Sequence, residues 1–418
     1  MDYQEIIQTI QNKRRFQNLP GVVVSKQILA AVGNPEKYLA CIHIAGTNGK
    51  GSTAAFLCSV LREAGIKTGL FTSPHLIDFT ERIQVDGERI QKEKAAEIGE
   101  RLLHLKLEAE PSMFDYCFAM AMIYFREQNC ELVILETGLG GRLDATNAID
   151  APLVSILTKV GYDHMEVLGT TLAEIAAEKA GILKRGTRAV LESQQPEVYE
   201  VFYQTLRRLG IPFSIVKPSQ IISVDGGFSY PNETPYHMKM LGEFQKENAM
   251  TAVLAARELI KMGYPVTEEA LHRGIAHAVW GGRMEVVCQN PFLLIDGAHN
   301  ESGVKALVQS LKTLYPDEKF HFIMGVLADK EYEKMAEWIL PLSDSVTTVT
   351  PESKRALSGE KLADYFKNAG VKAENKGELS EVLQPFFSAE RGGNFSRRTV
   401  AFGSLYFIGE IKKIFLQH

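Results

Sequence analysis

The chain has 418 residues, of which 45% are hydrophobic and 23% charged, so it is globular in composition and long enough for two or three domains. The formal net charge of −5 gives no indication of a nucleic acid or a membrane surface as a partner. The five cysteines are scattered and form no C-x-x-C pair, as is typical of a reducing compartment. The N-terminus is amphipathic and lacks the pattern of a signal peptide, and no run approaches the roughly 20 apolar residues of a membrane span. We therefore expect a cytoplasmic protein, and we expect it to be a monomer.

The N-terminal part is expected to lead into a buried strand. Residues 1–40 are predicted to form a helix, a loop at 18–21 and a second helix over 26–32. Residues 41–44 then form a short apolar strand, residues 46–51 a glycine-rich turn with one lysine, and a helix begins at Ser52 and Thr53.

The turn at 46–51 has the chemistry of a phosphate site. Its glycines present backbone N–H groups without side chains in the way, the helix that follows directs its positive dipole end to the same point, and Lys50 adds a full charge. The run G-T-N-G-K-G-S is shorter than the standard phosphate loop and has Gly51 between the lysine and the serine. A tight structural turn is the alternative, but it does not explain a lysine among three glycines.

Strand and helix patterns then alternate along the chain, which predicts a parallel, doubly wound sheet whose ligands gather at the carboxyl ends of the strands. The predicted strands are 68–71, 82–85, 132–135 and 153–157, and the predicted helices are 92–107, 112–128, 171–182 and 242–263. The weakly patterned segment 213–234 is expected to contain short antiparallel strands at a sheet edge.

A second α/β pattern follows Pro291, with strands at 292–295, 320–324, 345–349 and 399–402 and a C-terminal helix. The glycine pair in residues 280–283 breaks the preceding helix and is expected to be a hinge. The sequence therefore predicts an α/β protein of two domains. Residues 1–282 would form a phosphate-loop doubly wound sheet, and residues 283–418 a smaller Rossmann-like domain.

Several polar residues stand where predicted strands end. Glu136 closes the apolar strand before a glycine-rich turn, and a carboxylate beside a phosphate loop can hold Mg²⁺ directly or through water. Ser73 and His164 follow other strands and could add ligands, although a solvated strand end, a turn serine and a loop histidine are ordinary alternatives.

Four further residues allow two interpretations each. Lys179 lies in a helical pattern, where an exposed lysine is the usual case. Arg283 follows the glycine pair and could reach phosphate or form a surface ion pair. Asp296 and His299 follow another strand and could bind nucleotide, assist transfer or belong to a plain turn.

Together the motifs resemble those of the folylpolyglutamate synthase/dihydrofolate synthase family, within the ATP-dependent Mur ligase superfamily. The segments HIAGTNGKGST, FTSPHL with ERI, ETGLGGRLDATN, GYDHMEVLG, AAEKAGI, GEFQKENA, WGGRMEV, IDGAHN and GSLYFIGE occur in one order. The resemblance covers about residues 18–409. The ETGLGGRLDATN and FTSPHL segments are specific to the folate branch.

The resemblance implies a role for each matching residue. The ATP-binding residues would be Asn48, Gly49, Lys50, Gly51, Asn248, Arg283 and Asp296. The Mg²⁺ ligands would be Ser73, Glu136, His164 and Lys179, the last as a carbamylated lysine. His299 would serve the glutamate side of the site, and Lys50, Lys179 and His299 would be catalytic. The substrate-binding residues would be Ser112, Met113, Phe114, Asp115, Leu143, Asp144 and Ala145, with Phe114 stacked on the pterin ring and Asp115 or Asp144 paired with its N–H groups.

The implied reaction is the ATP-dependent addition of L-glutamate to a folate or to dihydropteroate through an acyl phosphate, with the second domain completing the ATP and glutamate site. Two alternatives stay open: a Mur-type cell-wall ligase, disfavoured because only about 40 residues precede the phosphate loop, and a phosphate-loop ATPase that acts as a switch. Phe244, Glu301 and Asp115 depart from the usual family residues, as does glycine at position 281.

Overall fold

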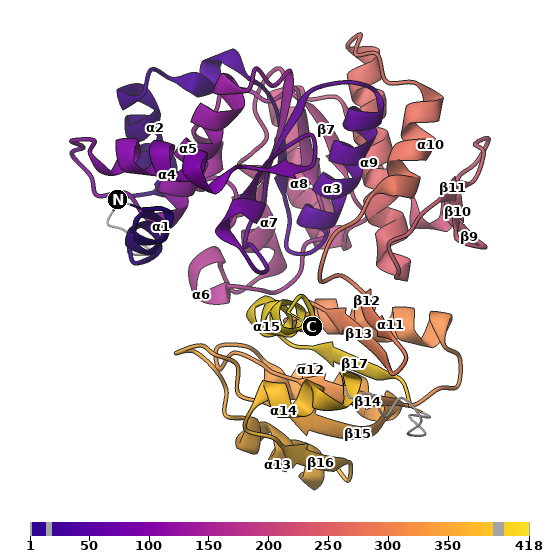
Figure 1. The fold of residues 1–418 in the computed structure, drawn as a ribbon. Helices are drawn as coiled ribbons and strands as arrows, with labels where there is room; N and C mark the ends of the chain where they lie inside the picture. The colour runs from indigo at the N-terminus through magenta and orange to yellow at the C-terminus, as the bar shows by residue number, and fades with distance from the viewer. Residues whose placement is uncertain (1, 14–18, 388–396, 418) are drawn as a thin grey trace. The chain divides into compact units, whose positions relative to one another are not determined.

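The computed structural model describes residues 2–13, 19–387 and 397–417, so Asn18 of the predicted first loop lies outside the described residues. The chain divides into two compact units (Figure 1). Unit 1 comprises Met1–Lys239 and Lys246–Val279, and unit 2 comprises Met240–Gln245 and Trp280–His418. None of the described helices combines the length and the apolar character that crossing a membrane requires.

Unit 1 is built on an eight-stranded sheet with the order β4-β3-β2-β5-β1-β6-β7-β8. Strands β2, β5, β1, β6, β7 and β8 run parallel to one another, and β3 and β4 add an antiparallel edge. This confirms the predicted doubly wound sheet. The strand bounds are β1 (Ala40–Ala45), β2 (Thr68–Phe71), β3 (Ile83–Val85), β4 (Glu88–Arg89), β5 (Leu132–Glu136), β6 (Val154–Leu157), β7 (Arg188–Leu191) and β8 (Phe213–Ile215).

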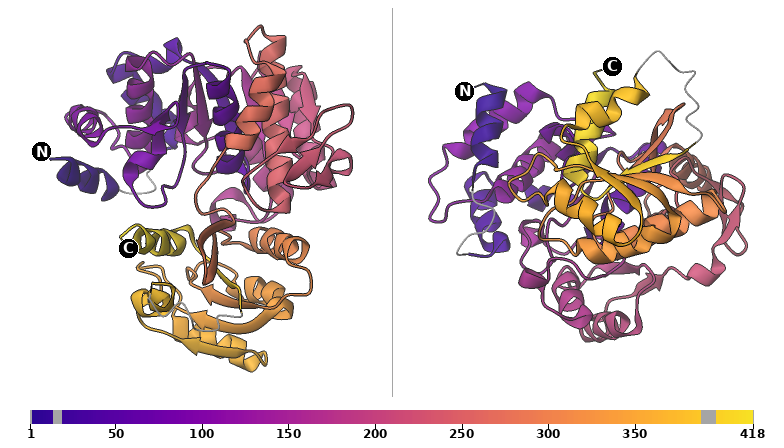
Figure 2. Two further views of the ribbon diagram at one scale, coloured as in Figure 1. Left: turned by 45° about the vertical axis from the view of Figure 1, so that its right-hand side comes forward. Right: turned by 90° about the horizontal axis from the view of Figure 1, so that it is seen from below.

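Helices cover both faces of this sheet (Figures 1 and 2). On one face Val133 and Leu135 pack with α1, α2, α4 and α5, and Leu157 and Leu191 pack with α7 and α8. On the other face α3 contacts β1, β2 and β5 and packs against α10. The central strands read as continuous apolar runs because both of their faces are buried. The helix bounds are α1 (Tyr3–Gln11), α2 (Gly21–Ala31), α3 (Lys50–Glu63), α4 (Lys92–Leu103), α5 (Met113–Glu127), α6 (Met165–Leu168), α7 (Leu172–Ala180), α8 (Pro196–Leu209), α9 (Glu243–Lys261) and α10 (Glu268–His277).

Some predicted boundaries were wrong. Helix α2 begins at Gly21, directly after Pro20 and five residues earlier than predicted. The segment 213–234 does not add antiparallel strands to the edge of the main sheet. Instead β8 pairs in parallel with β7, while β9 (Ile222–Val224), β10 (Gly227–Ser229) and β11 (Tyr236–His237) form a separate antiparallel sheet. Gly226, at φ +68°, allows the tight turn that pairs β9 with β10.

Unit 2 contains a six-stranded sheet with the order β12-β13-β17-β14-β15-β16, parallel except for β12. This confirms the predicted Rossmann-like α/β domain. Its elements are β12 (Glu285–Gln289), β13 (Phe292–Asp296), α11 (Glu301–Leu314), β14 (Phe320–Met324), α12 (Tyr332–Ile339), β15 (Ser343–Thr348), α13 (Gly359–Asn368), β16 (Lys372–Asn375), α14 (Leu379–Leu383), β17 (Thr399–Phe402) and α15 (Leu405–Phe415).

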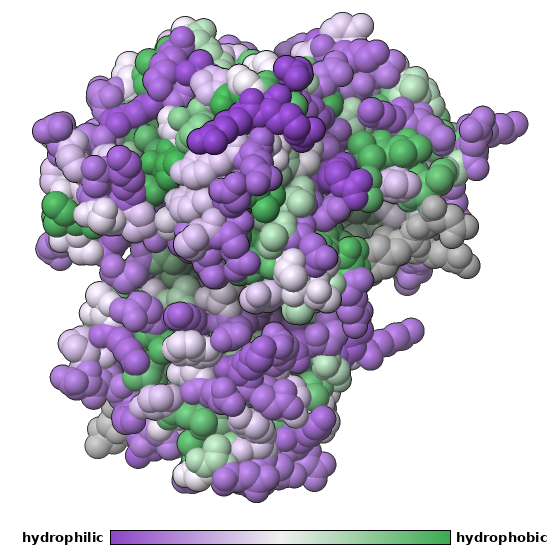
Figure 3. All heavy atoms as spheres, turned by 180° about the vertical axis from the view of Figure 1, so that it is seen from behind, coloured by the Kyte–Doolittle hydropathy of each residue, from purple (hydrophilic) through white to green (hydrophobic). Residues whose placement is uncertain are grey.

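The surface shown in Figure 3 is mainly hydrophilic on each unit, and hydrophobic residues are visible there only in small groups. The described residues on that face therefore form no broad apolar patch of the kind that marks a large protein interface.

We predict that Gly274→Ala destabilises the protein, because a Cβ at this position of α10 would lie 2.4 Å from the Cα of Val60 in α3. Main-chain atoms cannot yield as a flexible side chain can, so the expected loss is about 1–3 kcal/mol in the free energy of unfolding. Urea denaturation measures it. Gly377→Ala is the matched control, since its Cβ would meet nothing within 4 Å, and its effect should stay within about 0.5 kcal/mol. Equal stability of the two variants would contradict the packing explanation.

Candidate active site

The turn between β1 and α3 needs glycine at two positions. A Cβ at residue 46 would lie 1.8 Å from Thr158 Oγ1. Gly49 has φ +89°, and a Cβ there would lie 2.4 Å from Asn248 Oδ1. The turn is thus packed on its inner side against side chains, and its backbone takes a conformation that other residues adopt with strain.

Lys50 opens helix α3 and lies beside a carboxylate. Its Nζ donates to the carbonyl oxygens of Gly46 at 3.2 Å and Thr47 at 3.4 Å, and lies 3.9 Å from Glu136 Oε1. Glu136 is the last residue of β5 and pairs in register with Ile44 of β1. The lysine and the carboxylate therefore meet at the carboxyl edge of the sheet.

Two more predicted residues join this pair. The backbone N–H of Ser73 donates to Glu136 Oε2 at 3.1 Å. Lys179, only 3% exposed, donates from Nζ to the Gly46 carbonyl at 2.9 Å. The pKa of Lys179 is lowered to about 7, chiefly by burial and secondly by the nearby charge of Lys50. The exposed helix lysine considered from the pattern alone is therefore wrong.

His164 lies on the segment that follows β6. It has φ +51°, and its side chain is about half exposed, with Nε2 3.9 Å from Asp163 Oδ1. Earlier in the same segment, Gly161 exchanges two hydrogen bonds with the Thr47 side chain, at 3.0 and 3.1 Å. The segment that carries His164 is thus attached to the phosphate loop.

The predicted metal ligands suit Mg²⁺ better than a transition metal. Across the described ranges, no three His, Cys, Asp or Glu side chains are grouped so that they could hold a metal ion. Ser73, Glu136 and a carbamylated Lys179 would supply oxygen atoms, and Mg²⁺ prefers a few oxygen ligands completed by water. The closeness of Glu136 to Ser73 and of Lys179 to the same turn fits this donor set.

Asp115, a predicted substrate residue, is bound by the chain itself. It is 1% exposed, and its Oδ2 accepts from the backbone and hydroxyl of Ser112 at 2.9 and 2.5 Å, which closes a capping box at the start of α5. Its Oδ1 accepts from the Ser25 hydroxyl at 2.8 Å, an interaction that the sequence did not indicate. Its contact with a pterin stays a prediction.

Asp144 organises the loop after β5 in the same way. It is 7% exposed, and it accepts from the backbone N–H groups of Gly138 and Leu139 and from the backbone and hydroxyl of Thr146. Burial raises its pKa, against the effect of these hydrogen bonds. The Thr146 hydroxyl also lies 2.8 Å from Nε2 of His43, whose pKa burial lowers to about 3.

The remaining predicted substrate residues surround this loop. The partly buried Phe114 ring fills the space beside Gly138, where a Cβ would lie 2.6 Å from its Cζ, and it lies 5.6 Å from the Phe71 ring. Leu143 is 41% exposed, and its carbonyl accepts from Val22. Ser112 caps α5, Met113 is its first residue, and Ala145 is buried.

Glycines also bring this loop against the helix that carries Lys179. A Cβ at Gly181 would lie 2.4 Å from the Cα of Arg142, and one at Gly141 would lie 2.9 Å from the Lys179 carbonyl. Arg142 donates its backbone N–H to the Glu178 carbonyl and pairs with the Glu178 side chain at 2.7 Å. The sequence patterns indicated the loop after β5 and the helix with Lys179, but they did not indicate that the two are in contact.

Unit 2 groups three predicted residues around the end of β13. Asp296 is 3% exposed and accepts from the backbone N–H groups of Met284 at 2.9 Å and Ala298 at 2.8 Å. Burial raises its pKa, and the positive charge of Arg283 opposes that shift. The Arg283 guanidinium packs against Gly297, where an added Cβ would lie only 2.5 Å from it. His299 Nδ1 donates to the Gly297 carbonyl at 2.8 Å.

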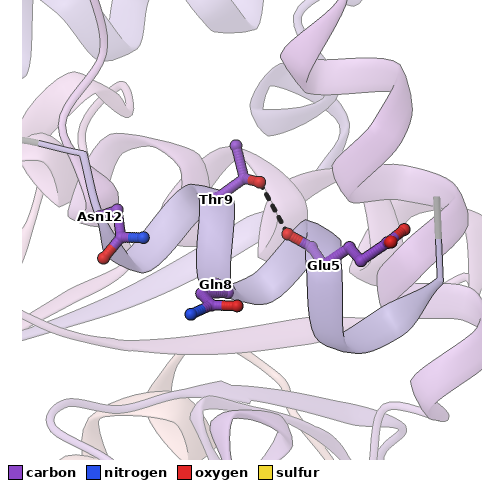
Figure 4. Close-up of a pocket in the computed structure, with 4 residues that line it drawn as sticks. All are labelled: Glu5, Gln8, Thr9 and Asn12. Carbon is purple, nitrogen blue, oxygen red and sulfur yellow. Dashed lines mark hydrogen bonds between the residues drawn. The ribbon is translucent and has the colours of Figure 1, made fainter.

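A separate open pocket has a wall formed by Glu5, Gln8, Thr9 and Asn12 along α1 (Figure 4). Its residues include none of the predicted site residues. The Thr9 hydroxyl in it donates to the Glu5 carbonyl at 2.7 Å and so already has a partner.

The chain is similar to known proteins over nearly its whole length. Residues 44–256 match the Mur ligase middle domain, and residues 282–389 match the Mur ligase glutamate ligase domain. The chain is 35% identical to the dihydrofolate synthase/folylpolyglutamate synthase of Bacillus subtilis, over 98% of each chain. A Mycobacterium tuberculosis folylpolyglutamate synthase complexed with ADP superposes with a TM-score of 0.87 at 27% identity, over 99% of this chain and 98% of that one. A structure of FPGS with AMPPCP and folate gives a TM-score of 0.85 at 28% identity, over all of both chains. The chain belongs to the dihydrofolate synthase/folylpolyglutamate synthase family of Mur ligases.

Proposed function

We propose that this protein is an ADP-forming ligase that uses ATP to join L-glutamate to a folate, and to dihydropteroate as well. The observation that carries the proposal is the meeting of Lys50, Glu136 and Ser73 at a glycine-rich turn that opens a helix. Family membership supports the choice of substrates, since a relative is named for both activities and a structural neighbour holds AMPPCP and folate.

The reaction begins when a substrate carboxylate attacks the γ-phosphorus of ATP. The bond from that phosphorus to the β–γ bridging oxygen breaks, so ADP leaves and an acyl phosphate forms. The amine of L-glutamate then attacks the acyl carbon, loses a proton and displaces phosphate to give an amide. A carboxylate oxygen is a poor leaving group, and phosphorylation makes the displacement possible.

The chain's own residues would position the phosphates and offset their charge. The backbone of residues 48–51 and the Lys50 ammonium would bind the ATP phosphates at the start of α3. We assign Asn248 to the adenine, Arg283 and Asp296 to ATP, and His299 to L-glutamate. In these assignments residues 1–282 act as the ATP-binding and folate domain, and residues 283–418 carry the further residues assigned to ATP and L-glutamate.

Ser73, Glu136, His164 and carbamylated Lys179 would hold Mg²⁺, which when bound neutralises phosphate charge during phosphoryl transfer. The lowered pKa of Lys179 is compatible with carbamylation, because only the neutral amine of a lysine attacks CO₂. Burial lowers the pKa of Lys179 to about 7, so a large share of the amine is neutral at pH 7 to 8. Addition of CO₂ and loss of a proton would turn this nitrogen into a carbamate with two oxygen atoms.

We assign the folate site to the loop after β5 and the start of α5. The partly exposed Phe114 ring beside Gly138 supplies a flat apolar surface on which a pterin can stack. Ser112, Met113, Leu143 and Ala145 would line the same site. Asp115 and Asp144 would reach the pterin N–H groups only if they exchanged hydrogen bonds that they now accept from the chain.

ADP release tests the proposal. It is measured with dihydropteroate, with tetrahydrofolate and with a uridine-nucleotide peptide, each with and without L-glutamate. We expect ADP release that depends on both a pterin substrate and L-glutamate. Release with the uridine-nucleotide peptide would instead support a cell-wall ligase, and release independent of all these substrates would support an ATPase switch.

We predict that Glu136→Ala abolishes ADP formation, because the variant loses the carboxylate that faces both Lys50 and Ser73. A steady-state assay of ADP release measures the effect, and a circular dichroism spectrum shows that the fold is intact. Glu93→Ala, an exposed substitution in the first turn of α4, is the control and should keep full turnover. Near-normal turnover in Glu136→Ala would exclude the metal assignment.

We predict that Lys179→Ala also loses turnover and that added acetate or formate restores part of it. The truncation leaves room beside the Gly46 carbonyl for a small acid, whose carboxylate would replace that of the carbamate. Turnover is compared in acetate and in chloride at the same ionic strength. Equal rates in the two salts, or unchanged turnover of the variant, would count against a carbamate at this position.

A further inference from the structure

Side chains at the exit of β7 continue the sheet beyond its last backbone pairs. The ladder between β6 and β7 ends at Leu157 and Leu191, with one more bond from the Glu192 N–H to the Leu157 carbonyl at 2.9 Å. Beyond this point the side-chain amide of Gln194 forms the next two hydrogen bonds. Its Oε1 accepts from the Val160 N–H at 3.0 Å, and its Nε2 donates to the Thr158 carbonyl at 2.9 Å.

Glu192 forms a hydrogen bond with Lys159, which lies between Thr158 and Val160. Its Oε2 accepts from the Lys159 N–H at 3.1 Å. The residue is 4% exposed, so the acceptor end of this hydrogen bond is buried. Side chains thus hold three consecutive residues, 158–160, where the backbone of a neighbouring strand would otherwise hold them.

The segment held in this way supports the phosphate loop. The Lys159 carbonyl accepts from the backbone N–H groups of Thr47 at 2.8 Å and Asn48 at 3.2 Å. Gly46 packs against the Thr158 side chain so closely that a Cβ would not fit. Two backbone N–H groups of the loop thus depend on the Lys159 carbonyl, so a shift of residues 158–160 would move the loop with it.

We propose that Glu192 and Gln194 are positioning residues that set the phosphate loop through the backbone of residues 158–160. The inference rests on the proposed function, in which this loop binds the polyphosphate of ATP. Neither side chain touches the nucleotide in this proposal. Both act on the direction of the loop's N–H groups and on the start of the segment that leads to His164.

The charge of the Glu192 side chain is compatible with this role. Its pKa is raised to about 8, chiefly by burial and secondly by the charge of Glu247 on α9, while Lys159 opposes the shift. Lys159 itself donates to the Ser193 hydroxyl at 2.5 Å and lies 3.4 Å from Glu247, so it offsets the carboxylates in this region. A largely neutral acid behind the loop does not repel phosphate, and a glutamine would reproduce its shape and its acceptor oxygen.

Calorimetric titration of the full-length protein with ADP tests the inference in four variants. Gln194→Met keeps the side-chain length but loses both hydrogen bonds, and Glu192→Leu loses the acceptor. Loss of one or two buried hydrogen bonds should raise the ADP dissociation constant about tenfold. Glu192→Gln should bind ADP as the unsubstituted protein does. Gln204→Ala, an exposed position of α8 bonded only to Glu200 in the described contacts, is the matched control and should change nothing.

Two further measurements separate positioning from general stability. The KM for ATP should rise in Gln194→Met and Glu192→Leu while the KM for L-glutamate stays within about twofold, whereas simple loss of folded protein would lower kcat and leave both KM values unchanged. If Gln194→Met does not fold, Gln194→Glu takes its place, since it keeps an acceptor for the Val160 N–H but sets a carboxylate oxygen against the Thr158 carbonyl. Unchanged ADP affinity in the folded variants overturns the inference while the proposed function stands. Failure of the unsubstituted protein to bind ADP overturns both.

Discussion

The hydrogen bonds from the backbone of Thr47 and Asn48 to the Lys159 carbonyl are the constraint on which the site depends. A glycine-rich turn has many accessible conformations in isolation, because glycine allows φ values that other residues avoid. Two N–H donors to one carbonyl, together with the bonds between Thr47 and Gly161, reduce those conformations to one. In the proposed function the N–H groups of residues 49–51 then face a phosphate at the start of α3.

The electrostatics of the site follow from that fixed turn. The Gly46 carbonyl accepts from both Lys50 and Lys179, so two amines are brought close to one another. Two buried ammonium groups at this separation would repel, and the cost is avoided because burial and the Lys50 charge lower the pKa of Lys179. The turn therefore places Lys50 beside Glu136, and it places Lys179 in a buried position where its pKa is lowered. In the proposed function Lys50 binds phosphate and Lys179 is modified.

The sequence was sufficient for the central strands of both sheets and for the edge at which the site lies. Apolar runs such as residues 132–135 predict buried parallel strands, and parallel strands bring their carboxyl ends, with Glu136 among them, to one edge. Strand β7 and helix α8 escaped prediction, and with them the roles of Glu192 and Gln194. Those roles depend on the register in which β7 lies beside β6, and register is a property of long-range packing that residue patterns do not state.

The burial of Lys179 shows most clearly why local patterns fail. Nothing in its helix distinguishes it from a solvated lysine, since the cause lies in a different segment. Gly141 and Gly181 lack the Cβ atoms that would keep the loop after β5 away from α7, and Arg142 fastens the two through Glu178. The same absence of a side chain at Gly46 and Gly49 lets the phosphate loop approach Thr158 and Asn248. Close approach of backbone to backbone at a few glycines therefore assembles polar groups from distant parts of the chain, and these glycines constrain the site as strongly as the charged residues they bring together.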